Sequence, residues 1–595
     1  MIVSLFGVFP AAAAPQDASK ALPALKPLTP TFSAPAAFDV SPALSDLAAA
    51  APTTLRAAVQ SDGDFEVRPD RGLFVPDNGF SGDGALQADS QLLATAADHN
   101  NNHGSPKIPA PKMNFEGLSN LDNFNIFGFR VNPPDPVGDV GPKHYVEMIN
   151  LVFGVYSKKT GALLLGPVDT GTLWAGFAVP DCTDASGDPI VLYDQFADRW
   201  LLSQFTTSGL DDPTRPFWNC VAISTTGDPT GAYYRYAFET ENFQFFPDYP
   251  KYGVWKDSYV LTTREFGPTI EYGIGVYALE KNKMINGDPN ARVVSFFIDG
   301  NDPTLLPLVG DGLLPPDIDG KEKPKDDAPA PIIGTQDDGG GYGATFDAIN
   351  IWELEVKWRS NPKASLELET QLPVASFDSI FPCGAPGGRD CLPQPSITDP
   401  AQFLDILSYR QRPTWRLAYR NFKDYEALVT NQSVEAMPGI AGARWYEIRR
   451  DKKGKYSIFQ QGTYAPNDGV HRWMGSIAMD KNGNIALGYS VVNGVDVYPG
   501  IRYTGRLKGD SRGKMTLGEG VIINGSGVQT TTNSRWGDYT SMNIDPVDDC
   551  TFWYVNEYYE VSGLPLPLPP PPLPPPGTTA PWQTRIASFK LPGCK

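Results

Sequence analysis

Short apolar runs recur along most of the 595-residue chain, separated by turns that contain Asp, Asn or Gly. Short runs of this kind, rich in aromatic and β-branched residues and bounded by turns, are typical of β-strands. Each recurring unit has a polar or Gly-containing opener, a short apolar strand, a turn, and a strand rich in aromatic and β-branched residues. The seven copies, of which the fourth is the weakest, begin at Asp135, Gly187, Asp248, Gly339, Thr414, Arg472 and Trp536.

Further strand-like runs follow most copies, so each repeat predicts a four-stranded sheet. A lone sheet of this size cannot cover its own apolar faces, whereas sheets stacked around an axis cover one another and leave only short edges. The 57 Pro and 58 Gly argue against long helices. The predicted fold class is all-β, a seven-bladed β-propeller, with six or eight blades as alternatives.

Ring closure requires one more strand, because the last copy supplies only three strand-like runs. Residues 123–131 (NFNIFGFRV) lie ahead of the first copy and carry alternating apolar residues. This segment is the predicted closing strand, and it would join the two ends of the chain.

The six cysteines lack a C-x-x-C motif, which favours disulfides in an oxidising compartment over a zinc site. Fifteen pairings can be drawn from six cysteines. Proximity in sequence favours Cys182 with Cys220, Cys383 with Cys391, and Cys550 with Cys594. The last bridge would hold the C-terminus.

The chain divides into three parts. Residues 1–14 combine an apolar run with small residues, which is typical of a secretory signal although the basic start is missing. Residues 15–108 are rich in Ala, Pro, Asp and Ser and are predicted to form a disordered leader. The propeller spans residues 109–595, with a Pro-rich loop at residues 564–581 that favours polyproline II. We therefore expect a secreted protein or one on the extracellular surface.

The formal net charge of −19 argues against nucleic-acid binding over the whole surface. No apolar run reaches the roughly 18 residues that span a bilayer. The expected partner is an extracellular glycan or a small polar ligand, and the chain is expected to be a monomer. No metal site or cofactor is predicted, apart from weak calcium binding by DIDGKE at residues 317–322.

The repeat pattern, with PDPVGDVGPKHYVEMIN and RWGDYTSMNIDPVDDCTFWYVNEYY, resembles secreted bacterial β-propellers of the sialidase-like, BNR-repeat kind. The two segments also resemble a family of secreted bacterial proteins of uncharacterised function. The resemblance covers roughly residues 110–595 and implies a propeller fold. Because the aspartate-box motif is degenerate here, echoed only by DPVDDCTFW and MDKNGNIAL, it does not imply sialidase activity.

The polar openers are expected to converge, because the innermost strands of a propeller all begin at one mouth of its channel. Openers of the first four copies are mainly acidic, and those of the last three mainly basic. Such a mouth suits an acidic or polyhydroxylated ligand. The structural alternative is that these groups pair with one another and with neighbouring backbone. The openers contribute Asp135, Asp139, Asp188, Asp248, Tyr249, Asp337, Asp338, Arg416, Arg420, His471, Arg472, Trp473, Arg535, Trp536, Asp538 and Tyr539.

Two groups of candidates follow from these residue types. Imidazole can exchange protons near neutral pH, and carboxylates with guanidinium groups serve glycan chemistry. The candidate catalytic residues are His471, Arg472, Asp538 and Tyr539. The candidate ligand-binding residues are Arg420, Trp473, Arg535, Trp536, Asp248 and Tyr249.

The leading hypothesis is a disulfide-stabilised propeller whose mouth binds an extracellular glycan or another polar ligand. The first alternative is a glycan-active enzyme, either a hydrolase or a lyase. The second is a protein-interaction scaffold that uses the Pro-rich loop and the outer strands. Neither H-E-x-x-H nor G-x-S-x-G occurs, and GGGYG at Gly339 lacks the Lys-Ser/Thr pair of a phosphate loop.

Overall fold

A computed structural model of the chain describes residues 22–51, 79–88, 107–240, 245–267, 271–383, 390–406, 411–530, 534–564 and 579–595. The signal-like segment and most of the Pro-rich loop lie outside these ranges. The described part is mainly β-strand, as the sequence predicted. None of its helices is long and apolar enough to cross a membrane.

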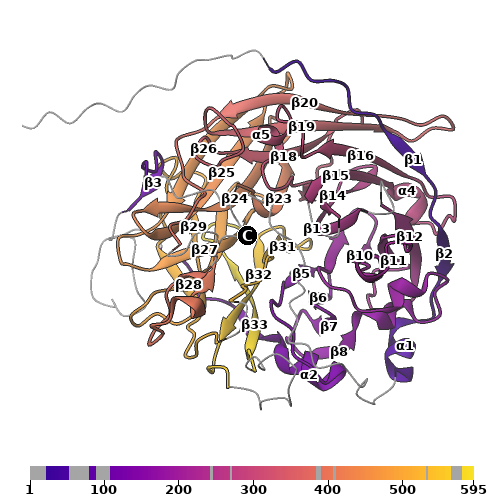
Figure 1. Ribbon diagram of the computed structural model, residues 1–595, viewed down its shortest axis with the longest axis horizontal. Coiled ribbons are helices and arrows are strands. Elements are labelled where there is room, and N and C mark those ends of the chain that lie inside the picture. Colours follow the sequence, from indigo (N-terminus) through magenta and orange to yellow (C-terminus); the bar gives the residue numbers. More distant parts are fainter. Residues whose placement is uncertain are drawn as a thin grey trace, which may run out of the picture.

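The first three sheets each contain four consecutive strands of one repeat (Figure 1). The first comprises β5 (Val137–Val140), β6 (His144–Ile149), β7 (Val152–Ser157) and β8 (Leu163–Asp169). The second comprises β9 (Ile190–Asp194), β10 (Arg199–Phe205), β11 (Trp218–Ser224) and β12 (Tyr233–Glu239). The third comprises β13 (Phe246–Val254), β14 (Ser258–Phe266), β15 (Glu271–Glu280) and β16 (Val293–Asp299).

The remaining sheets continue around the ring in chain order. The fourth contains β18 (Ala330–Gln336), β19 (Ala348–Lys357) and β20 (Lys363–Pro373), preceded by β17 (Pro316–Asp319). The fifth contains β23 (Thr414–Asn421), β24 (Glu426–Met437), β25 (Ile440–Arg450) and β26 (Tyr456–Tyr464). The sixth contains β27 (His471–Met479), β28 (Ile485–Val492), β29 (Gly500–Arg506) and β30 (Glu519–Ile523). The seventh contains β31 (Ser541–Ile544), β32 (Thr551–Tyr559), β33 (Trp582–Lys590) and β4 (Met113–Ser119).

Short elements connect and cover these sheets. The helices are α1 (Leu44–Ala50), α2 (Asn120–Phe127), α3 (Ser208–Asp211), α4 (Lys281–Met284) and α5 (Leu306–Val309). Three-residue to five-residue 3-10 turns are η2 (Thr170–Trp174), η3 (Pro180–Thr183) and η4 (Pro400–Gln402), and β21 (Asp390–Leu392) pairs with β22 (Leu404–Asp405).

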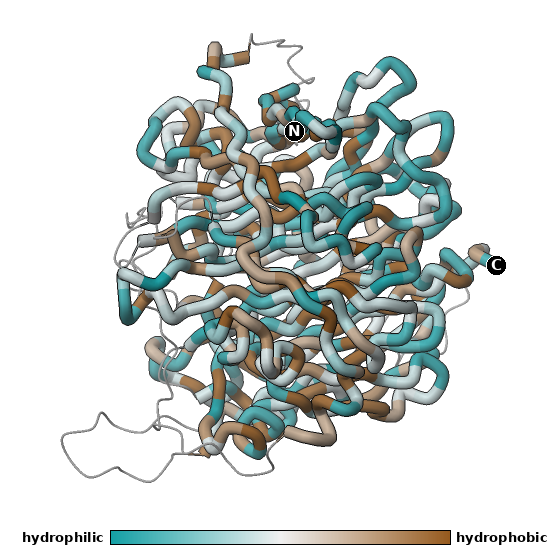
Figure 2. The backbone as a smooth tube through the Cα atoms, turned by 90° about the vertical axis from the view of Figure 1, so that its right-hand side faces the viewer, coloured by the Kyte–Doolittle hydropathy of each residue, from teal (hydrophilic) through white to brown (hydrophobic). Residues whose placement is uncertain are grey.

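The innermost strands close a ring. Contacts run in order from β5 to β9, β13, β17, β23, β27, β31 and back to β5. These strands all start at the same end of the ring axis, which we call the mouth face. The C-terminus lies near the axis at the opposite face (Figures 1 and 2). The all-β propeller fold is thus confirmed by the strand order and by this cycle of contacts.

Burial explains why the strands look apolar on both faces. Every residue of β28 and β32 is buried, because neighbouring sheets cover them on each side. Eight tryptophans are nearly inaccessible, and many outer loops are hydrophilic (Figure 2). The aromatic and β-branched residues of the repeats therefore form the packing between sheets.

The fourth repeat begins earlier in the chain than predicted. The strand at the ring axis that precedes it is β17, which pairs in parallel with β23 of the fifth sheet, whereas Gly339 lies in the connection between β18 and β19. The strand was hidden because residues 316–319 (PDID) carry two carboxylates and one proline. Asp317 and Asp319 both bind the guanidinium of Arg416, with N–O distances of 2.9 and 2.7 Å. Arg416 thus binds both aspartate carboxylates of the predicted calcium loop.

The predicted closing strand is wrong. Most of residues 123–131 belongs to α2, which a capping box between Ser119 and Asp122 begins and Gly128 ends in a left-handed conformation. The strand that completes the seventh sheet is β4, just ahead of this helix, and it pairs with the C-terminal β33. The two ends of the chain do meet, as expected, but through a different segment.

Parts of the leader are ordered. Strand β1 (Thr31–Ser33) extends the third sheet, β2 (Ala37–Val40) extends the second, and β3 (Leu86–Gln87) extends the fifth. The first two run along the outer rim in Figure 1. Prediction of disorder over residues 15–108 therefore fails for these segments, because their short apolar runs gain partners only at sheet edges.

The structure contains the three disulfides favoured by sequence proximity: Cys182–Cys220, Cys383–Cys391 and Cys550–Cys594. The described chain has no free cysteine. The third bridge joins the turn between β31 and β32 to the C-terminal residues, so it lies at the face opposite the mouth.

Candidate functional site

Several openers share an unusual backbone conformation at the mouth face. Six residues at or near the start of innermost strands have φ values between 40° and 55°, in the left-handed region that side chains usually avoid. This strain is characteristic of functional sites and of tight structural turns. The six residues are Asp135, Asp188, Tyr249, Gln411, Met474 and Ser534.

Asp135 connects the first and seventh sheets. Its carboxylate accepts hydrogen bonds from the Asn150 amide at 2.8 Å and from the Asp538 backbone N–H at 2.6 Å. Burial raises its pKa well above the usual value for aspartate, and the charges of Asp538 and Asp188 raise it further. Three carboxyl groups from two ends of the chain thus interact at one point, as the convergence of openers predicted.

Tyr249 and Tyr539 form an aromatic pair between the third and seventh sheets. Their ring centroids are 5.3 Å apart with the planes at 43°. The Tyr539 hydroxyl donates to Asp188 at 3.1 Å, which links the second sheet to the pair. Asp188, Asp248 and Asp538 are only partly buried, so they form the accessible rim above the rings.

Two buried cations lie against this pair. The Lys251 amine is 3.1 Å from the Tyr249 ring centroid and 3.3 Å from that of Tyr539. The Arg412 guanidinium carbon is 3.9 Å from the Tyr249 centroid. Sequence inspection had not singled out either residue, although a charge within a strand pattern (Lys251) and a charge just before a repeat (Arg412) are both signals of buried polar groups.

Arg535 belongs to the same cluster. It forms ion pairs with Asp405 at 3.2 Å and with Asp538 at 2.9 Å. Glu557 lies beneath and accepts from the Gly537 backbone N–H at 2.5 Å. Burial, with further contributions from Asp135 and Asp538, raises the Glu557 pKa well above its usual range. The cluster at the mouth thus contains two carboxyl groups with raised pKa values, Asp135 and Glu557, beside the ion pairs of Arg535.

Other candidates lie elsewhere. Arg420 is at the end of β23, where it pairs with Asp549 at 2.7 Å, and Arg416 is buried between Asp317 and Asp319. Asp139 is also buried, and it accepts a hydrogen bond from the Tyr193 backbone N–H. The structure therefore places Arg420 near the face opposite the mouth rather than with Arg535.

His471 and Arg472 are held by structural contacts. The His471 Nδ1 accepts from the Ala441 backbone N–H at 3.2 Å, and burial, assisted by Arg472, lowers its pKa to about 4. Arg472 is fully enclosed and forms ion pairs with Asp468 and Glu519 at 2.7 and 2.8 Å. Their contacts agree with the structural alternative considered for these two residues.

The two tryptophans serve the core. Trp473 and Trp536 have ring centroids 5.1 Å apart, and each is inaccessible to solvent. The Trp536 indole N–H donates to Ser490 at 3.1 Å. Neither ring has a face that a sugar could reach in this arrangement.

Asp337 and Asp338 lie with Asp347 in an acidic group whose oxygens are within 4.8 Å of one another. The Asp337 oxygens accept from Ser379 and the Gly339 backbone, and those of Asp347 accept from backbone N–H groups. Backbone donors thus already occupy these two carboxylates.

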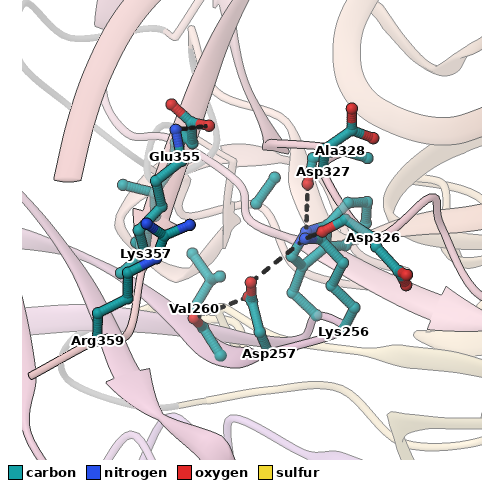
Figure 3. A pocket seen from close by; sticks show the side chains of 14 residues that line it. Lys256, Asp257, Val260, Asp326, Asp327, Ala328, Glu355, Lys357 and Arg359 are labelled. Atoms are coloured by element: carbon teal, nitrogen blue, oxygen red, sulfur yellow. Dashed lines mark hydrogen bonds and ion pairs between the residues drawn. The ribbon is translucent and has the colours of Figure 1, made fainter. Parts of the chain in front are cut away.

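A separate cavity of about 500 Å³ lies between the third and fourth sheets, toward the face opposite the mouth (Figure 3). Its walls carry Lys256, Lys357 and Arg359 together with several carboxylates. Lys256 is paired with Asp257 at 3.3 Å, and Lys357 with Glu355 at 2.8 Å. Its charges are largely matched within the wall, so the mouth is the stronger candidate site.

No protein-family model and no curated protein matches this chain. Solved structures similar to it include the following three. An α-L-arabinanase mutant from Cellvibrio cellulosa has 10% identity and a TM-score of 0.26, covering 65% of this chain and 94% of its own. The N-terminal domain of Nup159 has 8% sequence identity and a TM-score of 0.31, and the match covers 81% of this chain and 98% of that domain. An exo-β-1,3-galactanase from Clostridium thermocellum has 9% sequence identity and a TM-score of 0.28, and the match covers 77% of this chain and 93% of the galactanase. TM-scores this low support no conclusion about function.

Proposed function

We propose that the mouth of this propeller binds an extracellular glycan or a similar polyhydroxylated ligand. The observation that carries the proposal is the group of partly buried carboxylates Asp188, Asp248 and Asp538 at the mouth. Carboxylates accept hydrogen bonds from the hydroxyls of a sugar, and the buried Tyr249–Tyr539 pair supports this rim from below. A few placed polar groups around aromatic surface are typical of ligand sites.

An extracellular location supports this ligand class. Three disulfides fit an oxidising compartment, where polysaccharides are abundant binding partners. The strained openers favour the same assignment, because six left-handed residues at one mouth cost stability that a binding site would justify.

A glycan array with purified variants tests the proposal. Asp188→Asn and Asp538→Asn should each weaken binding of a retained glycan at least tenfold, because they replace rim acceptors while preserving shape. Asp424→Asn is the matched control, since Asp424 is exposed on a turn at the opposite face, where it forms an ion pair with Lys452. If Asp188→Asn and Asp538→Asn both bind the glycan as tightly as the wild-type protein, the proposed site is wrong.

Glycan hydrolysis is the second candidate, and one observation favours it. Asp135 has a raised pKa and lies beside Asp538, which is the kind of asymmetry that separates a general acid from its partner carboxylate. His471 and Arg472 have no role in this hydrolysis hypothesis, because His471 accepts from the Ala441 backbone and Arg472 pairs with Asp468 and Glu519.

Release of reducing ends from a bound polysaccharide distinguishes binding from hydrolysis. Asp135→Asn should lower such activity by at least about 100-fold while glycan retention stays intact. Asparagine tolerates the left-handed backbone that Asp135 adopts, so the variant is expected to fold. Absence of reducing-end release by the wild-type protein on every retained glycan would leave binding as the function.

A further inference from the structure

Lys251 is buried without a hydrogen-bond acceptor. Its side chain extends from β13, and the residue is 1% exposed. No described residue supplies an acceptor for its Nζ atom, whose neighbours are the faces of Tyr249 and Tyr539. A buried ammonium group normally has a carboxylate or carbonyl partner, because its desolvation is costly. The fold therefore buries an amine for which the described chain provides no acceptor.

Arg412, next to Lys251, also has buried nitrogen atoms without a hydrogen-bond acceptor. The residue is 2% exposed, and its Nε and Nη1 atoms have no acceptor within the described chain. Its guanidinium contacts the ring of Tyr249, which Lys251 also contacts. Two cations that share one aromatic neighbour repel each other unless an anion joins them.

Other buried cations in this protein are treated differently. Arg416 is bound by Asp317 and Asp319, and Lys281 by Asp194 and the Trp255 carbonyl. Each has acceptors provided by the chain itself. Arg420, Arg444 and Arg506 also have one buried nitrogen without an acceptor, but each binds a carboxylate or carbonyl oxygen through another nitrogen. Lys251 and Arg412 differ because their described contacts are with aromatic rings.

The carboxylates nearest to these cations are engaged elsewhere. Asp188 accepts the Tyr539 hydroxyl, and Asp538 pairs with Arg535. Burial lowers the Lys251 pKa well below its usual value despite the nearby Asp188 charge. An added carboxylate would restore the charged amine and supply the missing acceptors.

We propose that the mouth selects glycans that carry carboxylates, namely uronic acids, and that Lys251 and Arg412 receive those carboxylates. This inference rests on the proposed function, since it specifies which glycan the same site takes. A uronate oligosaccharide carries one carboxylate on each sugar, so successive residues offer acceptors to both cations. The net charge of −19 repels long polyanions, which favours short oligosaccharides as ligands.

Titration calorimetry with trigalacturonic acid and its carboxyl-reduced neutral counterpart tests the selectivity. The wild-type protein should bind the acid at least tenfold more tightly than the neutral sugar. Lys251→Met and Arg412→Met should each remove most of that preference, measured as the ratio of the two affinities. Lys452→Met makes the same formal charge change at an exposed turn and should have no effect.

Thermal unfolding of the same variants separates ligand recognition from a structural role. Lys251→Met should unfold at the same or a higher temperature, because it removes a buried amine without an acceptor. A clear loss of stability would instead mean that Lys251 holds the fold together, and it would overturn the assignment.

The two proposals fail in different ways. Equal affinity for acidic and neutral trisaccharides would overturn the uronate inference and leave glycan binding standing. If neither sugar binds and no glycan on the array is retained, the proposed function fails and the inference fails with it. The wild-type comparison decides the matter even if a variant does not fold.

Discussion

Single buried carboxyl groups make this protein sensitive to pH. Glu147 on β6 accepts hydrogen bonds from the Leu118 backbone and Tyr156, and it contacts the Thr584 hydroxyl. Burial raises its pKa to about 7. The native protein therefore keeps this proton over a pH range in which the unfolded chain has lost it.

The first prediction follows from the sign of this shift. The folded-state pKa of Glu147 lies above its ordinary value of 4.5, so its contribution to stability is full below about pH 4.5 and is lost as pH rises through about 7. The loss is on the order of 3 kcal/mol, at about 1.4 kcal/mol per pKa unit. Urea midpoints measured at pH 5, 7 and 9 should fall with increasing pH.

Glu147→Gln isolates the effect. A glutamine amide can donate to Thr584 while its oxygen keeps the Leu118 and Tyr156 donors, so the variant should fold and show a flatter pH dependence. Asp424→Asn is the control, because its exposed carboxylate should leave the slope unchanged. An identical slope in Glu147→Gln and wild type would contradict the assignment.

Individual strands show how far sequence reasoning reaches. Short apolar runs after polar openers located most innermost strands, since neighbouring sheets cover both faces of these strands. The sequence pattern missed β17, because its segment PDID contains two aspartates. Both form ion pairs with Arg416, a contact that the sequence does not reveal. The pattern also missed β1 and β2 because edge strands of three or four residues carry too few positions for a period.

The candidate site shows the same limit at the level of side-chain direction. Asp135, Asp188, Tyr249, Asp538 and Tyr539 met at the mouth because strand order alone brings openers together. Arg420 lies at the far end of β23, away from the mouth. For His471 and Arg472 the register decides the outcome, since a shift of one residue turns a side chain to the other face of its sheet. Only the paired strands fix that register.

The leader elements give the second prediction. Leu44, at the start of α1, is fully buried, and its backbone N–H donates to the Gly231 carbonyl. Leu44→Ala should remove roughly 2–5 kcal/mol of local packing. The expected result is faster hydrogen exchange across Ala37–Val40, with the inner strands unchanged. The exposed Leu22→Ala serves as control, and unchanged exchange in Leu44→Ala would mean that β2 is held by its ladder to β12 alone.

The whole molecule depends on joining its ends, because a ring of sheets with one gap leaves two apolar faces exposed. Pairing of β4 with β33 closes the gap across more than 450 residues, and the Asn120 amide adds a bond to the Ala580 carbonyl. Cys550–Cys594 then fixes the chain just beyond β33. Closure is thus built from contacts between the two ends of the propeller.

The third prediction compares this bridge with a local one. Cys550 and Cys594 are 44 residues apart, whereas Cys383 and Cys391 are 8 apart. Since a cross-link restricts the unfolded chain more when its loop is longer, the double Ser variant of the first pair should lose about 1.5 kcal/mol more than that of the second. Chemical denaturation under non-reducing conditions measures both losses. Equal losses would mean that the contacts of β33 with β32 and β4, rather than the bridge, determine how firmly the ring is closed.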